Sequence, residues 1–192
     1  MTVSYDIVLV GASWGGLAAL RTLISALPAD FTLPVVCVQH RHRDSTSVLA
    51  PILQEYSRLN VCEVDDKAPI AGGNVYIAPA DYHLLVERGH FSLSVDEPVR
   101  YSRPSIDVAF ESASDAYGSG VIGVVLTGAN ADGAHGLKRI VERGGLALVQ
   151  EPATAESPPM PTAALRAVPE ARSMTLADIA LTLASLPGVH TG

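Results

Sequence analysis

A short apolar run that ends in a glycine-rich turn constrains the fold of this chain more than any other feature. Residues 6–10 read D-I-V-L-V and lead directly into G-A-S-W-G-G. A strand that is apolar on both faces is typical of a parallel sheet that is covered by helices on each side. Beyond the turn, leucine and isoleucine recur at helical spacing until Pro28, which ends the helix. The chain therefore begins with a predicted buried strand, a tight turn and a helix.

The same alternation continues along the chain. We expect further strands at residues 34–39, 60–64, 121–126 and 146–150, and further helices at residues 47–57, 104–117, 134–142, 162–167 and 176–186. Pro104 is expected in the first turn of its helix, where an N–H makes no hydrogen bond within the helix and proline is therefore tolerated. Three short apolar runs between residues 75 and 95, separated by glycine, proline and aspartate, predict antiparallel hairpins.

These elements predict an α/β fold. We expect a doubly wound, mostly parallel sheet in a Rossmann-like three-layer arrangement, with an antiparallel hairpin insertion. The chain has 192 residues, of which 48% are hydrophobic, and it shows no linker or internal repeat. This length is enough to bury the core of a single domain spanning residues 1–192.

Charge and apolar pattern exclude several classes of protein. The formal net charge of −7 argues against a nucleic-acid-binding surface, which needs a basic face. No apolar run is long enough to cross a bilayer, and no basic region precedes the first run as in a signal peptide. Cys37 and Cys62 lie in apolar runs, which favours free thiols in a reducing compartment, with a disulfide as the alternative. We expect a cytoplasmic protein without membrane insertion, and the sequence predicts no oligomeric state.

Three of the predicted strands end in residues that carry chemistry. Ser13 follows the first strand, His40 follows the second, and Asp132 follows the strand at 121–126. Because the carboxyl ends of parallel strands share one edge, we expect these side chains to meet there. A serine hydroxyl needs a histidine to accept its proton, and the histidine needs a carboxylate to hold its tautomer. The residues therefore predict a catalytic triad, although each also has a structural alternative, such as helix capping by Asp132.

The turn around Ser13 also offers candidate donors for an oxyanion. Gly-x-Ser-x-Gly between a strand and a helix permits a sharp turn that exposes the hydroxyl. The backbone N–H groups of Trp14 and Gly15 lie near the positive end of the following helix, where a developing negative charge is stabilised. The chain order Ser, His, Asp differs from the Ser, Asp, His order of α/β-hydrolases.

Six segments carry a resemblance to a known family. They are IVLVGASWGGLAAL, VVCVQHRHRD, GGNVYIAPADYHLLV, RPSIDVAFESAS, VIGVVLTGANADGAHGLKRI and MPTAAL. In this order they resemble the catalytic domain of the CheB family, the protein-glutamate methylesterases of bacterial chemotaxis, over about residues 6–187. The resemblance implies hydrolysis of glutamate γ-methyl esters on the cytoplasmic domain of methylated chemoreceptors, with release of methanol and often deamidation of glutamines. It implies Ser13 as nucleophile, His40 as base and Asp132 as carboxylate, and it requires no cofactor and no metal.

The chain departs from the family pattern around the predicted site. Trp14 stands where the family usually has threonine, and Ala129 replaces a methionine whose backbone N–H is implicated in the oxyanion hole. The N–H of Ala129 is expected to serve equally, and Asn130 is a further candidate for lining the site. Typical members also carry an N-terminal receiver domain, whereas here the catalytic pattern begins within ten residues of Met1. The sequence is thus either a free-standing catalytic domain or a piece of a longer chain.

Two other groups of residues have open interpretations. Arg41, His42 and Arg43 follow the predicted base on an otherwise acidic protein, and we hypothesise that they attract acidic substrate helices. A solvated loop is the alternative for this cluster. Arg103 and Asp107 of the R-P-S-I-D motif have either a structural role at a helix start or a role in binding substrate.

Three functions compete with the methylesterase interpretation. A glycine-rich turn after a first strand also binds dinucleotides, but here the pattern is G-A-S-W-G-G instead of G-x-G-x-x-G. An altered homologue that acts as a binding protein in a chemosensory-like pathway is the second. The third is a hydrolase with the same mechanism that acts on another ester or amide.

Overall fold

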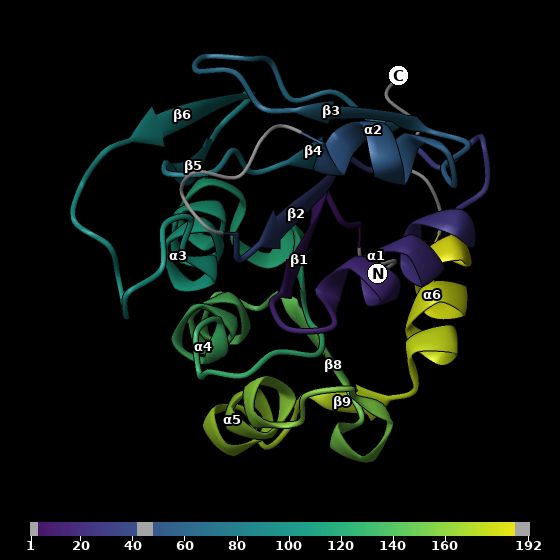
Figure 1. Cartoon of the computed structure of the whole chain (residues 1–192), viewed down its shortest axis with the longest axis vertical. Coiled ribbons are helices and arrows are strands. Elements are labelled where there is room, and N and C mark those ends of the chain that lie inside the picture. Colours follow the sequence, from purple (N-terminus) through teal and green to yellow (C-terminus); the bar gives the residue numbers. More distant parts are fainter. Residues whose placement is uncertain (1–3, 42–47, 187–192) are drawn as a thin grey trace.

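The computed structural model describes residues 4–41 and 48–186, and its centre is a sheet of seven parallel strands (Figure 1). The strands lie in the order β3-β4-β2-β1-β7-β8-β9, and each neighbouring pair is parallel. Their bounds are β1 Ile7–Ala12, β2 Val35–Gln39, β3 Asn60–Glu63, β4 Asn74–Ile77, β7 Val121–Val125, β8 Leu146–Gln150 and β9 Arg172–Met174. The prediction of a doubly wound, mostly parallel sheet is confirmed.

Helices cover both faces of this sheet and so complete the three layers. They are α1 Gly16–Ser25, α2 Leu49–Gln54, α3 Ile106–Tyr117, α4 Ala134–Glu142, α5 Pro159–Ala167 and α6 Leu176–Ala184. Helices α1 and α6 lie to the right of the sheet in Figure 1, and α3, α4 and α5 lie to its left. Helix α2 belongs to the same layer as α1 and α6, because its buried side chains join the same core. Each layer encloses its own apolar core. The first core includes Leu20 of α1 and Ile179 of α6, and the second includes Phe110 of α3 and Ile140 of α4.

The antiparallel insertion is also present, although it is smaller than predicted. Strands β5 His83–Glu87 and β6 His90–Ser94 form a separate antiparallel sheet that packs against α3. The run at 75–78 was predicted to belong to the same hairpins, and this was wrong. It forms most of β4, which lies between β2 and β3 in the main sheet. A four-residue strand has too little pattern to identify its partners, which come from distant segments.

Several boundaries differ from the prediction for local reasons. Strand β9 was not predicted, because its three residues are mostly exposed and carry no apolar run. Helix α5 begins at Pro159, before the predicted start at residue 162. Helix α3 begins at Ile106 with Ser105 as its N-cap, so Pro104 precedes the helix and is not in its first turn.

The topology places three chain segments at one edge of the sheet. Strand β1 is central, with β2 on one side and β7 on the other, and all three run in the same direction. Their carboxyl ends therefore lie together, where the chain leaves β1 toward α1 on one face and leaves β7 toward α4 on the other. The N-terminus of α3 also approaches this edge, because a Cβ on Gly11 of β1 would come within 2.5 Å of Ile106.

Within residues 4–41 and 48–186, no helix combines the length and the apolar character that crossing a bilayer requires.

Candidate active site

Ser13 is the first residue after β1, and hydrogen bonds hold its backbone on both sides. Its N–H donates to the carbonyl of Thr127 at 3.0 Å, and its own carbonyl accepts from Nε2 of Gln39 at 2.8 Å. Gly15 then adopts a left-handed conformation with φ of 77° and serves as the N-cap of α1. A Cβ at this position would also come within 2.7 Å of Glu156, so glycine is required for two reasons. The turn thereby fixes the hydroxyl between the end of β1 and the start of α1.

His40 is the first residue after β2, and its ring lies between Ser13 and Asp132. Its Nδ1 is 3.2 Å from Oγ of Ser13, and its Nε2 is 2.7 Å from Oδ2 of Asp132. The Asp132 side chain is fully buried, whereas the His40 side chain is 12% exposed. The structure thus brings the three predicted residues into one chain of contacts, in the order that proton transfer from a serine requires.

Asp132 lies in the loop between β7 and α4, and its carboxylate faces the N-terminus of α3. Oδ2 accepts from the N–H of Ile106 at 2.7 Å, and Oδ1 accepts from the N–H of Asp107 and from Oγ of Ser105, each at 3.0 Å. The alternative of a cap for the following helix does not describe this residue, because Gly133 is the N-cap of α4. The carboxylate instead binds the exposed amides at the start of a different helix.

These contacts decide the charge of Asp132 and the tautomer of His40. Burial opposes ionisation of Asp132, but hydrogen bonds from His40 and from the backbone N–H groups of Asp107 and Ile106 outweigh it and lower the pKa of this carboxyl. An ionised carboxylate only accepts hydrogen bonds, so Nε2 of His40 carries a proton and donates it to Asp132. The lone pair of Nδ1 is then directed toward the Ser13 hydroxyl, as a general base requires.

Asp107, at the start of α3, binds the loop that contains Asp132. Its Oδ1 accepts from the N–H groups of Gly133 at 2.9 Å and Gly136 at 2.7 Å, at the start of α4. Burial raises the pKa of the Asp107 carboxyl to about 6, and the negative charge of Asp132 adds to the effect, although both amides and Arg100 oppose it. Asp132 therefore binds the N-terminus of α3, the helix that contains Asp107, and Asp107 binds the N-terminus of α4, the helix that follows Asp132. The sequence left open whether Asp107 of the R-P-S-I-D motif has a structural role or binds substrate. Its hydrogen bonds to the start of α4 are a structural role.

The predicted oxyanion donors make no hydrogen bond in the part of the chain that the structure describes. They are the backbone N–H groups of Trp14, Gly15 and Ala129. Nδ2 of Asn130 lies 3.3 Å from Nδ1 of His40, and Oδ1 of Asn130 accepts from the N–H of Asp132. Asn130 therefore contacts the same ring nitrogen that faces the Ser13 hydroxyl.

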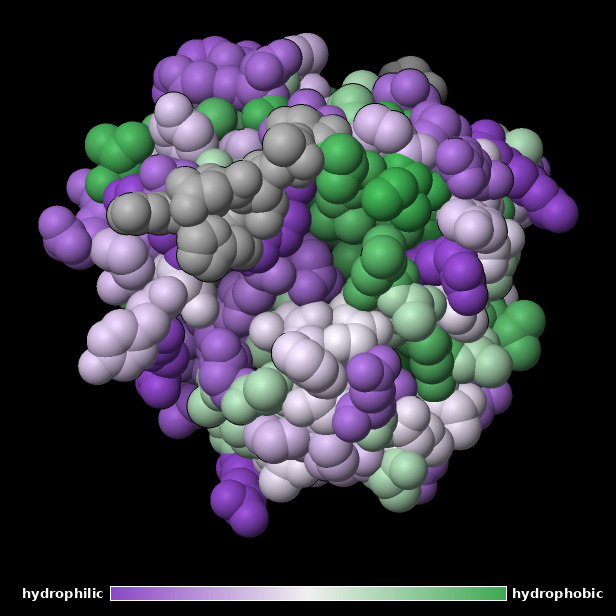
Figure 2. All heavy atoms as spheres, viewed as in Figure 1, coloured by the Kyte–Doolittle hydropathy of each residue, from purple (hydrophilic) through white to green (hydrophobic). Residues whose placement is uncertain are grey.

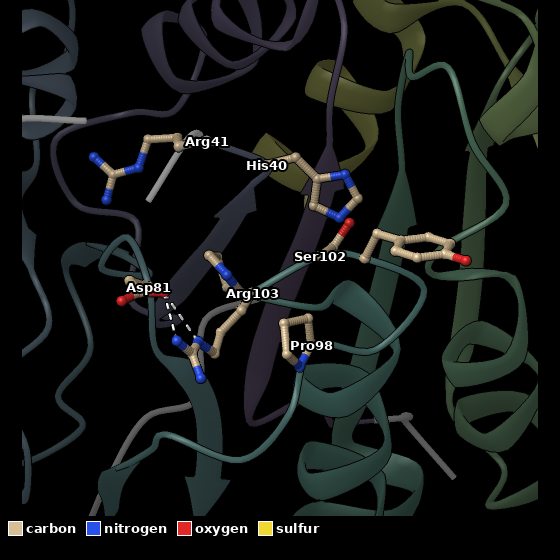
Figure 3. A pocket seen from close by; sticks show the side chains of 8 residues that line it. His40, Arg41, Asp81, Pro98, Ser102 and Arg103 are labelled. Atoms are coloured by element: carbon tan, nitrogen blue, oxygen red, sulfur yellow. Dashed lines mark hydrogen bonds and ion pairs between the residues drawn. The ribbon is translucent and has the colours of Figure 1, made fainter. Parts of the chain in front are cut away.

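Arg41 was expected to attract acidic substrate helices, but its side chain binds groups of the protein itself. Figure 3 shows the Arg41 and His40 side chains pointing in opposite directions from adjacent positions. Nη2 of Arg41 donates to Glu63 and to the carbonyl of Ala78, each at 2.9 Å, and the side chain is only 9% exposed. A guanidinium removed from water in this way requires a carboxylate partner, which Glu63 supplies. The other two members of the cluster, His42 and Arg43, lie outside the described residues.

Two clefts flank His40. One, of about 490 Å³, is bordered by Asp81, Ser102 and Arg103, and Figure 3 shows the ion pair between Asp81 and Arg103. The other, of about 610 Å³, opens on Ser13 and is bordered by side chains of α1 and α2. A segment of substrate that reaches Ser13 therefore has space on both sides of the histidine.

Three supporting residues were not predicted from the sequence. Gln39 binds the carbonyl of Ser13, and Ser105 donates to Asp132. Oγ1 of Thr127 donates to the carbonyl of Trp14 at 2.9 Å and accepts from the N–H of Ser157 at 2.8 Å. All three belong to the segments Q-H, R-P-S and L-T-G that carried the family resemblance. Their position beside predicted site residues was the signal that they face the same edge.

Comparison with known proteins points to one family. The family model for the CheB methylesterase matches residues 8–183. A relative from Leptospira interrogans, provisionally named protein-glutamate methylesterase/protein-glutamine glutaminase, is 45% identical over 179 residues, which cover 93% of each chain. A relative from Carboxydothermus hydrogenoformans with the same activity in its name is 40% identical over 186 residues. That alignment covers 94% of this chain and 55% of the relative, so this chain spans about half of that longer protein.

The structural comparison leads to the same family. The crystal structure of the Thermotoga maritima CheB methylesterase catalytic domain superposes with a TM-score of 0.91 at 32% sequence identity, and the alignment covers 96% of this chain and all of that one. The fold, the matched family model and the identity to named methylesterases all agree. The chain therefore belongs to the CheB methylesterase family, which consists of enzymes that hydrolyse carboxylic esters.

Proposed function

We propose that this chain is a serine hydrolase that demethylates glutamate γ-methyl esters on the cytoplasmic domain of methylated chemoreceptors. The observation that carries the proposal is the continuous contact from Oγ of Ser13 to Nδ1 of His40 at 3.2 Å and from Nε2 of His40 to Asp132 at 2.7 Å. The names of the relatives support the same reaction. We further propose that residues 1–192 act as a single catalytic domain in the cytoplasm.

The mechanism follows from the direction of these hydrogen bonds. His40 accepts the Ser13 proton on Nδ1 while Oγ attacks the ester carbonyl, and Asp132 stabilises the imidazolium through Nε2. The negative charge that develops on the carbonyl oxygen is received by backbone N–H groups of Trp14, Gly15 or Ala129. His40 then protonates the departing methoxide, which leaves as methanol and creates an acyl-enzyme on Ser13.

Hydrolysis of the acyl-enzyme completes the cycle. His40 removes a proton from a water molecule, the water oxygen attacks the acyl carbonyl, and the proton returns to Oγ of Ser13 as the glutamate carboxylate is released. The same acyl-enzyme forms from a glutamine side chain if ammonia leaves in place of methanol. The second activity in the names of the relatives, protein-glutamine glutaminase, supports this extension of the proposal.

Methanol release from a carboxyl-methylated chemoreceptor fragment tests the proposal. We expect the wild type to release methanol and Ser13→Ala to reduce kcat/KM by roughly 10⁴- to 10⁶-fold. Ser25→Ala is the matched control, because this exposed serine at the end of α1 donates only to the carbonyl of Thr22. Release of methanol by Ser13→Ala at the wild-type rate would exclude Ser13 as the nucleophile.

A serine-reactive phosphonate separates two reasons for a negative result. If the wild type releases no methanol but Ser13 is labelled, the chain is a hydrolase that acts on another ester. If Ser13 is not labelled either, the chain is an altered homologue that binds its partner without hydrolysis. Both results would overturn the proposed reaction on chemoreceptors.

A further inference from the structure

Exposed apolar side chains gather on one side of Ser13. The described part of the chain has nine large hydrophobic side chains that are exposed, and four of them border the same cleft: Trp14, Leu17, Ile52 and Tyr56. Figure 2 shows hydrophobic residues concentrated over α1 and α2 on this face of the molecule. A concentration of this kind is typical of a surface that binds a partner, whereas single exposed hydrophobic residues are not.

This apolar cleft is continuous with the candidate active site. Ser13 and His40 belong to its border, together with the four apolar side chains, and its volume is about 610 Å³. The cleft on the other side of His40 has a mixed border, because the ion pair of Asp81 and Arg103 lies there beside Tyr101 and two prolines. Any segment that delivers an ester to Ser13 therefore lies between the apolar surface of α1 and α2 and this mixed border.

Trp14 is the most exposed member of this cleft, although its backbone is firmly held. Its side chain is 68% exposed. Its carbonyl accepts from Oγ1 of Thr127, and the neighbouring Ser13 and Gly15 are fixed by a backbone hydrogen bond and by the left-handed turn. The indole is thus presented from a rigid position next to the nucleophile. Tryptophan on a rigid backbone is among the residues that contribute most to protein interfaces.

We propose that the cleft of Trp14, Leu17, Ile52 and Tyr56 binds an apolar side chain of the substrate that lies one helical turn from the scissile ester. The inference rests on the proposed function, because it takes the occupant to be the same segment that carries the methylated glutamate. On a helix, residues three or four positions apart are about 5–6 Å apart on one face, so an ester and its apolar neighbour approach Ser13 and Trp14 together. Trp14 then determines which esters are hydrolysed.

The test compares two helical peptides that contain a glutamate γ-methyl ester and differ at one position. One peptide has leucine four residues after the ester and the other has serine there, and a second pair of peptides carries the same difference four residues before the ester. We expect the wild type to prefer the leucine peptide by about 10- to 100-fold in kcat/KM, as for a contact in an apolar pocket. In Trp14→Ala the preference should fall to within about threefold, and in Ile52→Ala to an intermediate value. Leu181→Ala, which removes an exposed leucine from α6, should keep the wild-type preference.

A binding measurement provides a second readout that does not depend on turnover. Trp14 is the single tryptophan of the sequence, so its emission reports on this cleft alone. In Ser13→Ala, which cannot form an acyl-enzyme, the leucine peptide should shift the emission to shorter wavelength and the serine peptide should not. No shift with either peptide at concentrations that saturate the wild type would overturn the inference.

The outcomes distinguish failure of the inference from failure of the proposed function. Methanol release from both peptides at equal kcat/KM would overturn the inference and leave the function intact. No methanol from either peptide or from receptor fragments would overturn the function and the inference together. If the preference is absent and Trp14→Ala converts a dimer into a monomer in sedimentation experiments, the apolar surface binds a second copy of the chain and the inference is wrong.

Discussion

The carboxylate of Asp132 accepts hydrogen bonds from several groups besides His40. Besides His40, it accepts from the backbone at Ile106, Asp107 and Gly133 and from the hydroxyl of Ser105. Such a carboxylate has its position and its charge determined by the protein, because rotation would break several hydrogen bonds at once. The orientation of the imidazole is then determined by the start of α3, and not by His40 itself.

Asp132→Asn tests this arrangement at a single residue. The three donors to Oδ1 keep the amide oxygen on their side, so the amide nitrogen faces Nε2 of His40 and requires it to accept. Nδ1 then carries the proton and no longer accepts from Ser13. We expect kcat/KM for methanol release to fall by about 10³- to 10⁴-fold. Asp178→Asn at the start of α6 is the control, and retention of activity within tenfold in Asp132→Asn would contradict the assigned tautomer.

Asp107 leads to a prediction about stability and pH. The pKa of its carboxyl is about 6 in the folded protein, above the usual 3.8 of the unfolded chain. The folded state is therefore favoured by this group below about pH 4, and the benefit is lost as the pH rises to about 6. Asp107→Asn keeps an oxygen that accepts from Gly133 and Gly136 but is never charged.

We expect Asp107→Asn to melt roughly 2–6 °C higher than the wild type at pH 7.5. This difference should disappear at about pH 4, where Asp107 is protonated in both states. Thermal unfolding followed by circular dichroism across this pH range measures both values. The control is Asp30→Asn, which makes the same change in an exposed side chain. A variant that is less stable than the wild type at every pH would contradict the prediction.

The sequence predicted which site residues follow the ends of parallel strands, but not the contacts that hold those residues. Ser13, His40 and Asp132 each follow a parallel strand, so their meeting at one edge follows from the sheet alone. The contact between Asp132 and the start of α3 could not be predicted, because it depends on how closely α3 approaches β1. The ion pair of Arg41 with Glu63 could not be predicted for a similar reason, since Glu63 comes from β3 on the far side of β4.

At the scale of elements, long apolar runs were predicted well, whereas of the short strands β3 was predicted and β4 and β9 were not. Strands β1, β2, β7 and β8 have five or six residues that are almost all buried, and their type was predicted correctly. Strand β4 has four residues and was assigned to the wrong sheet, and β9 has three and was missed. These short strands are stabilised by hydrogen bonds to their neighbours, which local sequence does not record.

The packing of α3 against α4 connects stability with the site. Gly136 of α4 has no side chain to separate the two helices, and a Cβ there would come within 2.5 Å of Phe110 and 2.9 Å of the carbonyl of Asp107. The same two helices exchange the hydrogen bonds of Asp107 and Asp132 across their N-termini. A change in their spacing therefore moves the carboxylate that orients His40.

We expect Gly136→Ala to destabilise the protein by about 1–3 kcal/mol, because overpacking outweighs the gain of about 1 kcal/mol in helix propensity. Activity should decrease together with stability, since Asp132 shifts with the helix. Urea unfolding and methanol release measure the two effects. Lys138→Ala on the exposed side of α4 is the control and should change neither by a large amount. An increase in stability for Gly136→Ala would show that the helices can separate freely.

At the scale of the whole molecule, one sheet serves two cores. The first core lies under α1, α2 and α6, the second lies under α3, α4 and α5, and strands β1, β2 and β7 contribute side chains to both. Ser13, His40 and Asp132 follow these three central strands. The site therefore lies at the edge of a sheet that both cores share, and neither core can unfold without exposing the strands that the other core covers.

Urea unfolding should therefore remove the fold and the site in one transition. We expect the loss of phosphonate labelling at Ser13 and the loss of helical circular dichroism to have the same midpoint. Leu20→Ala in the first core and Phe110→Ala in the second should each destabilise the protein by about 2–5 kcal/mol. Both signals should move together in both variants, although the two side chains lie on opposite faces of the sheet. If Phe110→Ala shifts labelling alone, the α3 layer opens locally and the shared sheet does not couple the two cores.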